Sequence, residues 1–139
     1  MGLRKEFYQV DQTMRLKFKP RSVSVSEALG LPRLIRKNFE VPLPMQDNEL
    51  ILVGRDDSAV SIAIHDEFIS RVHAAIIHEN GCFYLRDLRS KNGTFLNGTR
   101  LPSDINSRAL MDGDKIGFNH VEFHFYSGQF QQAMGGSFN

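Results

Sequence analysis

An all-β fold, organised as an antiparallel β-sandwich, is predicted by three features of this sequence. Apolar residues come in short runs, and in several of these runs apolar and polar residues alternate with a period of two. Turn-forming pairs such as Asn-Gly separate the runs at intervals that are typical of a sandwich. The chain has 139 residues, which is enough to bury one core, and its single cysteine excludes an intrachain disulfide.

The first two strands are expected where small groups of apolar residues alternate with polar ones. Val23 and Val25 alternate with serines, and the segment 39–43 repeats this pattern. Between these strands, residues 26–37 are expected to hold no more than one helical turn, because Gly30 and Pro32 interrupt a longer helix.

Five later runs are rich in β-branched, aliphatic and aromatic residues, as strands are. They are Leu50–Val53, Val60–Ile64, Val72–His78, Cys82–Leu88 and Val121–Tyr126. Asn80-Gly81 is typical of a tight hairpin between two of these runs, and residues 112–114 form another turn sequence.

Charge divides the chain into an arm and a body. Residues 1–40 hold nine Lys and Arg against four Asp and Glu, whereas residues 41–139 hold eight against twelve. We therefore expect a basic, flexible N-terminal arm at 1–20, one folded domain at 21–127 and a flexible Gly/Gln-rich tail at 128–139.

The arm has two open interpretations. It is either solvated or lies over its own acidic body, or it contacts an acidic partner or a nucleic acid. The second interpretation would use the cations Arg15, Lys17, Lys19 and Arg21. Nucleic acid is the less expected partner, since no platform of stacking aromatic residues accompanies these cations.

The location of the protein is expected to be intracellular, either cytoplasmic or nuclear. A cysteine-poor chain suits a reducing compartment. No apolar run approaches the length of a membrane span, and the N-terminus lacks the apolar region of a signal peptide, so no membrane partner is expected.

Small, hydroxyl, amide and cationic residues recur in the loops between the expected strands. They form four blocks in the order Gly54-Arg55, Ser70-Arg71-Val72-His73, Ser90-Lys91-Asn92-Gly93-Thr94 and Asn97-Gly98. A guanidinium offers a planar fork of donors, lysine adds a charge, serine adds a hydroxyl, and glycine lets backbone N–H groups approach a ligand. The chemistry of this set is that of an anion-binding site.

The order and spacing of these blocks resemble the forkhead-associated (FHA) domain. The resemblance implies a non-catalytic β-sandwich of about eleven strands that binds phosphothreonine peptides through loops at one end. It implies no cofactor and no metal. The partners it implies are phosphothreonine-containing proteins and an upstream Ser/Thr kinase.

The resemblance also assigns roles to the loop residues. It makes Arg55 the main phosphate-binding arginine, Ser70 the phosphate-bonding hydroxyl, and Arg71 and Lys91 further phosphate contacts, although Lys91 stands where the family often has a small hydroxyl residue. The side chain of Asn92 would bond the peptide backbone. The structural supports would be Gly54, His73, Gly93, Thr94, Asn97 and Gly98.

Specificity is expected to involve Phe68. If Ile69 points inward, Phe68 is left near the loop surface, where its ring favours an apolar residue three positions after the phosphothreonine.

Other interpretations of these residues remain open at the level of sequence. Arg55 is followed by two aspartates at 56 and 57 and is equally suited to pair with them. Ser70 and His73 invite comparison with a hydrolase, but the strained turn that such a serine needs is missing. An enzyme is therefore a remote alternative.

A metal site is a further alternative in the last strand. His120, Glu122 and His124 lie on one face because their spacing is two. Ligands on one strand are too far apart for a tight tetrahedral site, so this face is expected to be a solvated one.

Overall fold

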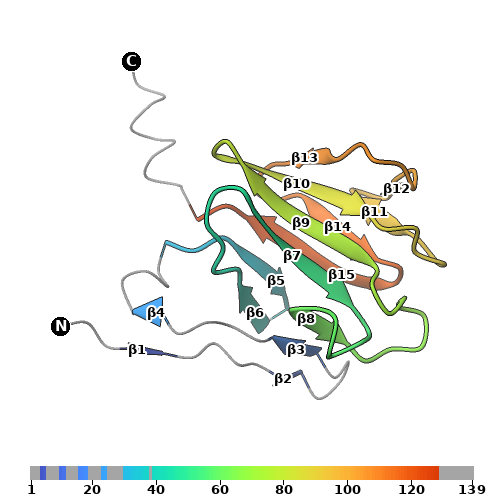
Figure 1. Cartoon of the computed structure of the whole chain (residues 1–139), viewed down its shortest axis with the longest axis horizontal. Helices are drawn as coiled ribbons and strands as arrows, with labels where there is room; N and C mark the ends of the chain where they lie inside the picture. The colour runs from blue at the N-terminus through green and yellow to red at the C-terminus, as the bar shows by residue number, and fades with distance from the viewer. Residues whose placement is uncertain are drawn as a thin grey trace.

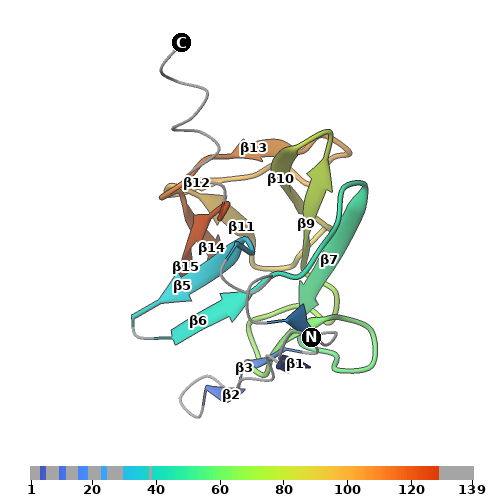
Figure 2. The same cartoon turned by 90° about the vertical axis from the view of Figure 1, so that its left-hand side faces the viewer.

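The computed structural model describes residues 4–5, 10–11, 16–18, 23–24, 30–37 and 39–128. These residues form strands, turns and bends and contain no helix. Figure 1 shows the strands in chain order, and Figure 2 shows two layers, with β7, β9 and β10 facing β5, β6, β14 and β15. The predicted all-β sandwich is confirmed, and eleven strands, β5 to β15, lie between residues 33 and 126.

Two main sheets build the sandwich among the described residues. The first has the strand order β13 (Arg108–Leu110), β10 (Cys82–Asp87), β9 (Ala74–Glu79), β7 (Glu49–Gly54), β8 (Ile62–Ile64), β3 (Leu16–Phe18) and β2 (Val10–Asp11). The second has the order β12 (Thr99–Arg100), β11 (Thr94–Leu96), β14 (Lys115–Phe118), β15 (Val121–Tyr126), β5 (Arg33–Arg36) and β6 (Phe39–Pro42). A two-stranded sheet joins β1 (Arg4–Lys5) to β4 (Val23–Ser24).

Pairing is antiparallel except between β7 and β8, which run parallel with Val53 opposite Ile62. The loop at 55–61 connects these two strands. At its end, Ser61 N–H donates to the Leu52 carbonyl over 3.0 Å, which brings the start of β8 back beside β7. The loop therefore stays close to the end of β7. Arg55 is the first residue of this loop, so the pairing of β7 with β8 also fixes where Arg55 lies.

The core lies between the two sheets. Its largest fully buried side chains include Phe118, Phe123 and Phe125 from β14 and β15, which face Ile76 and Leu85 from the opposite sheet. Each such side chain contributes roughly 1.5–3 kcal/mol when it leaves water. The alternation expected for the last strand is confirmed, since residues 121, 123 and 125 are buried while 122, 124 and 126 are exposed.

The hairpin predicted at Asn80-Gly81 is confirmed, and Asn97-Gly98 forms another. Asn80 and Gly81 have φ angles of 54° and 78°, and Asn97 and Gly98 have φ angles of 50° and 86°. Glu79 pairs with Cys82, and Leu96 pairs with Thr99, so each loop has two residues. Two positive φ angles in a two-residue loop match the right-handed twist of the flanking strands.

The region expected to hold a helical turn is instead partly a strand. Arg33–Arg36 forms β5, which pairs with β15 and β6. Leu34 is completely buried, so the packing of this segment in the core overrides its local sequence. The expectation for residues 26–29 lies outside the described residues.

The expected arm and tail are described only in part. The backbone of Leu16–Phe18 pairs with β8 and extends the first sheet, so this piece of the arm belongs to the sandwich. Gly128 has a φ of 77°, and a Cβ there would lie 2.4 Å from the Leu31 carbonyl oxygen, so the packed region reaches residue 128. The side chains of residues 1–29 and the tail from 129 onward lie outside the described residues, and the boundary at 20/21 stays a prediction.

Candidate functional site

The loops at 55–61, 65–73 and 88–93 meet at one end of the sandwich, and we call them the loop cluster. Backbone hydrogen bonds join the first two loops: Arg55 N–H donates to the Ser70 carbonyl over 2.9 Å, and Asp56 N–H donates to the Arg71 carbonyl over 3.2 Å. The block that begins at Gly54 and the block that begins at Ser70 therefore run side by side.

Gly54 makes this approach sterically feasible. A Cβ at this position would lie 2.1 Å from the Arg71 carbonyl oxygen, which is closer than any real contact. Gly54 is not among the residues with positive φ, so a left-handed backbone is not the reason for this glycine. Its role is to leave room for the neighbouring backbone.

Arg55 is exposed at the rim of the loop cluster, and its side chain is anchored at one atom. Its Nε donates to the Ile69 carbonyl over 2.9 Å, which orients the guanidinium. Asp56 instead accepts two hydrogen bonds from Ser58, which lower the pKa of Asp56, and Asp57 contacts His65. Among the described residues, no ion pair joins Arg55 to either aspartate.

Ser70 connects the second loop to the third. Its Oγ accepts a hydrogen bond from Lys91 N–H over 3.0 Å, so the hydroxyl lies beside the backbone of Lys91. Asn92 makes a second connection, because its Nδ2 donates to the Phe68 carbonyl over 2.9 Å. The hydroxyl hydrogen of Ser70 and the side-chain oxygen of Asn92 can still form hydrogen bonds to a ligand.

His73 is completely buried beneath these loops and bonds backbone at both ring nitrogens. Ser70 N–H donates to Nδ1 over 3.1 Å, and Nε2 lies 2.9 Å from the Gly93 carbonyl. Since Nδ1 accepts, the proton is on Nε2 and the ring is neutral. Burial lowers the pKa of His73, with smaller opposing effects from the Gly93 bond and the charge of Asp87. A ring held in this way does not abstract a proton from Ser70 Oγ.

Asp87 is a supporting residue that the sequence analysis missed. It is buried at the end of β10, and its carboxylate accepts hydrogen bonds from the hydroxyls of Ser90, Thr94 and Ser103. Burial raises the pKa of Asp87, but these hydrogen bonds outweigh burial and hold the pKa below its ordinary value. Ser90 Oγ in turn accepts from Gly93 N–H over 3.0 Å.

These bonds form one continuous network under the loop cluster. It leads from Asp87 to Ser90, then to Gly93, then through the His73 ring to Ser70. A fully satisfied buried network of this kind fixes the loop backbone. The only sequence signal for Asp87 was the position of one acidic residue at the end of an apolar strand.

Arg100 is a second residue that the sequence analysis missed. It pairs with Phe95 across the β11–β12 hairpin, and a Cβ at Gly93 would lie 2.8 Å from its Nε. Its NH2 group lies 3.5 Å from the Lys91 carbonyl. The sequence signal for Arg100 is the Asn97-Gly98 pair. A two-residue hairpin loop there pairs residue 95 with residue 100 and so brings Arg100 beside Phe95 and the third loop.

The other predicted supports lie where a structural role requires them. Thr94 is buried and bonded to Asp87, and Gly93 has a φ of 99°, which only glycine adopts readily. Asn97 Oδ1 accepts from Lys115 N–H, and its Nδ2 donates to Asp114, so the hairpin at Gly98 is attached to the start of β14.

The structure therefore brings together the predicted site residues 55, 70, 71, 91 and 92 at one end of the domain. Arg55, Arg71 and Lys91 are exposed there, and the backbone N–H groups of Arg55 and Lys91 both bond Ser70. The expected orientation around Phe68 is also confirmed, because Ile69 is 1% exposed whereas Phe68 is 49% exposed.

The three residues of the metal alternative lie on the exposed side of β15 and the turn before it. Within residues 30–37 and 39–128, no group of three His, Cys, Asp or Glu side chains lies close enough to hold a metal. In the same part of the chain there is no helix of the length and apolarity that a membrane span requires.

The sequences and structures of known proteins match the part of the chain that carries the loop cluster. Residues 51–119 match the family model of the FHA domain. The chloroplastic zeaxanthin epoxidase of Prunus armeniaca is 49% identical over 74 residues, which cover 49% of this chain and 11% of that protein. An ABC transporter ATP-binding/permease protein of Mycobacterium tuberculosis is 36% identical over 78 residues, which cover 56% of this chain and 8% of that protein.

The chain thus spans a small fraction of those relatives, and the likeness concerns one domain of each. Among solved structures, the FHA domain of an Arabidopsis thaliana hypothetical protein has a TM-score of 0.62 at 29% identity, and covers 77% of this chain and 94% of that chain. The MEK1 FHA domain in complex with a phosphothreonine peptide of HOP1 has a TM-score of 0.59 at 27% identity, and covers 70% and 97%. Since family model, fold and loop geometry agree over the same residues, this chain carries an FHA domain and belongs to the forkhead-associated family.

Proposed function

We propose that this domain recognises phosphothreonine-containing segments of partner proteins and performs no catalysis itself. The observation that carries the proposal is the arrangement at the loop cluster, where the exposed residues Arg55, Arg71 and Lys91 lie on loops that are hydrogen-bonded to one another at Ser70. Three exposed cations and a hydroxyl donor suit a phosphate dianion. The FHA domains are typically non-catalytic binding modules, and the solved MEK1 domain holds a phosphothreonine peptide.

The principal phosphate contact in this proposal is Arg55. Its Nε is already bonded to the Ile69 carbonyl, so little side-chain entropy is lost when the terminal nitrogens meet the phosphate. Ser70 Oγ accepts from Lys91 N–H and donates its own proton to the same anion. Arg71 and Lys91 add charge at the rim.

Asn92 holds the peptide backbone in this proposal. Its Nδ2 is bonded to the Phe68 carbonyl, which orients the side chain beside the second loop and leaves its side-chain oxygen to accept a hydrogen bond from the peptide backbone. Phe68 then reads the side chain at the third position after the phosphothreonine, through its exposed ring.

A Ser/Thr kinase that acts before the domain follows from this proposal, because the ligand exists only after phosphorylation. We place the domain in the cytoplasm or nucleus, where such kinases act on protein substrates. The free, exposed thiol of Cys82 is compatible with a reducing compartment.

The direct test is isothermal titration calorimetry with one peptide sequence in three forms, carrying phosphothreonine, phosphoserine or unmodified threonine. We expect measurable binding of the phosphothreonine form, weaker binding of the phosphoserine form and none of the unmodified form. Equal binding of all three forms contradicts the proposal.

A matched pair of variants connects the result to the loop cluster. Arg55→Ala removes the proposed phosphate contact, whereas Arg108→Ala removes an arginine of β13 that lies outside the loop cluster. We expect the first to reduce the difference between the affinities for phosphorylated and unmodified peptide and the second to preserve it.

A further inference from the structure

His120 belongs to the turn between β14 and β15 but contacts a different loop. Its ring and the Phe68 ring have centroids 5.8 Å apart and planes at 85°, an edge-to-face pair. Its Nε2 lies 3.0 Å from Asp66 Oδ2. The interpretation of this residue as one of a row of solvated polar groups on the last strand is therefore incomplete.

Asp66 connects the two rings. Its Oδ1 accepts a hydrogen bond from Phe68 N–H over 2.8 Å, while its Oδ2 is the atom near His120. One carboxylate therefore fixes both the backbone that carries the Phe68 ring and the imidazole that stands against this ring. Both rings keep about half of their surface exposed, at 49% for residue 68 and 54% for the side chain of residue 120.

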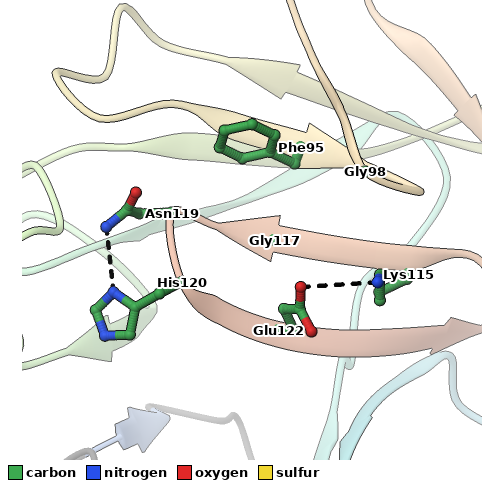
Figure 3. Close-up of a pocket in the computed structure, with 7 residues that line it drawn as sticks. All are labelled: Phe95, Gly98, Lys115, Gly117, Asn119, His120 and Glu122. Carbon is green, nitrogen blue, oxygen red and sulfur yellow. Dashed lines mark hydrogen bonds and ion pairs between the residues drawn. The ribbon is translucent and has the colours of Figure 1, made fainter.

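Asn119 connects the same pair to the phosphate side of the loop cluster. Its backbone N–H donates to the Gly93 carbonyl over 2.9 Å, and its Nδ2 lies 3.1 Å from His120 Nδ1 (Figure 3). The Gly93 carbonyl also contacts the His73 ring, so the position of His120 is tied to the backbone below the cations.

His120 also lines a hollow of about 300 Å³. Its origin is a missing side chain in a cross-strand row, because Gly117 of β14 stands between Phe95 of β11 and Glu122 of β15. Figure 3 shows this gap, with Asn119 and His120 at one end and the Lys115–Glu122 ion pair at the other. His120 is therefore shared by the ring pair with Phe68 and by the lining of this hollow.

We propose that His120 is a second specificity-determining residue, whose ring forms with the Phe68 ring a corner that selects an apolar side chain of the bound peptide. The hollow over Gly117 gives room for the branched end of that side chain. This inference rests on the proposed phosphopeptide binding and adds to it a residue from a turn that none of the four sequence blocks includes.

The chemical class of the selected side chain follows from how the polar atoms of the corner are used. Both oxygens of Asp66 and both ring nitrogens of His120 already face partners within the domain. What remains for the ligand is ring surface, so an apolar side chain gains contact area and leaves no polar group unpaired. A ligand carboxylate at the two rings would lose water without gaining a hydrogen-bond donor from the corner.

The test uses phosphothreonine peptides that are identical except at the third position after the phosphothreonine, where they carry Leu, Ala, Asp or Lys. Fluorescence anisotropy gives the Kd of each peptide for the unaltered chain and for His120→Ala. We expect the unaltered chain to bind the Leu peptide about fivefold more tightly than the Ala peptide. In His120→Ala this preference should fall about threefold or more, while the Kd of the Ala peptide changes less than twofold.

His124→Ala is the matched control. His124 is the same residue type, lies on the exposed side of β15 and is outside both the corner and the hollow. We expect the His124→Ala variant to prefer the Leu peptide over the Ala peptide by the same ratio of Kd values as the unaltered chain.

A second measurement, made on the unaltered chain, covers the case in which His120→Ala does not fold. In the complex with the Leu peptide, we expect nuclear Overhauser contacts between the leucine methyl groups and the His120 ring protons, and none with those of His124.

The outcomes separate this inference from the proposed function. An unchanged preference in folded His120→Ala, an equal loss of affinity for the Leu and Ala peptides, or a missing methyl–His120 contact would overturn the inference while phosphate-dependent binding still stood. If no phosphorylated peptide bound more tightly than its unmodified form, the proposed function would fail first and this inference with it.

Discussion

Thr94 Oγ1 donates a hydrogen bond of 2.6 Å to Asp87 Oδ1, which joins the start of β11 to the end of β10 underneath the third loop. Ser90 and Ser103 donate to the same carboxylate from the loops on either side. The loop that carries Lys91 and Asn92 is therefore held at both ends by one buried charge.

The first prediction concerns this carboxylate. Asp87→Asn should lower the free energy of unfolding at pH 7 by about 2–3 kcal/mol, because an amide offers one acceptor oxygen where three hydroxyls and one N–H now donate. Urea unfolding followed by circular dichroism measures this change. Asp104→Asn alters an exposed carboxylate nearby and should change stability by less than about 0.5 kcal/mol.

The second prediction is the pH dependence of that stability. Hydrogen bonds overcome the effect of burial and hold the pKa of Asp87 below 3.8 in the folded state. The stabilisation is therefore complete above about pH 4 and is lost as pH falls through the lower, folded-state pKa. The difference in unfolding free energy between the unaltered chain and Asp87→Asn should narrow between pH 4 and pH 2.5. A difference that stays constant over this range would show that Asp87 is not the titrating group.

The third prediction concerns the phosphate contacts. Arg55→Ala should weaken the binding of a phosphothreonine peptide by roughly 2–4 kcal/mol, because it leaves part of the dianion unpaired. Arg55→Lys keeps the charge but loses both the planar fork and the Nε bond to the Ile69 carbonyl, so it should recover only part of the affinity. Calorimetry on folded variants measures both. Full recovery by lysine would show that charge alone matters.

The fourth prediction concerns Ser70. Ser70→Ala should cost about 1–2 kcal/mol of binding, since it removes one hydroxyl donor and also the acceptor that holds Lys91 N–H. Ser58→Ala removes a hydroxyl that bonds Asp56 in the neighbouring loop and serves as the control. If both substitutions have the same small effect on Kd, Ser70 does not contact the phosphate.

The fifth prediction is that binding tightens as pH rises from about 5.5 to 7.5. The second phosphate pKa is about 6, and three cations favour the dianion. Burial lowers the pKa of His73, so this ring stays neutral and does not produce the trend. Phosphorus NMR of the free and bound peptide should show a lower phosphate pKa in the complex. An unshifted phosphate pKa would contradict this assignment.

Much of this fold was readable from local sequence. Strand periodicity predicted β7, β9, β10 and β15, since an alternating face needs only its own residues to be recognised. The Asn-Gly pairs predicted two hairpins for the same reason, because positive φ angles are a local property of those residues. Short strands such as β11 and β14 were missed, as their few residues carry too little pattern.

The sequence alone also determined which residue types gather in the loops, and the order of the four blocks indicated an anion-binding end. What only the tertiary structure decided is how distant loops support one another. The Arg71 backbone leaves no room for a Cβ at Gly54. Asp87 accepts hydrogen bonds from three segments of the chain. The His120 ring packs against the Phe68 ring of another loop. These contacts join residues that are far apart in the chain. They form only when the two sheets pack and bring the loops together, so the spacing of the residues along the sequence does not predict them.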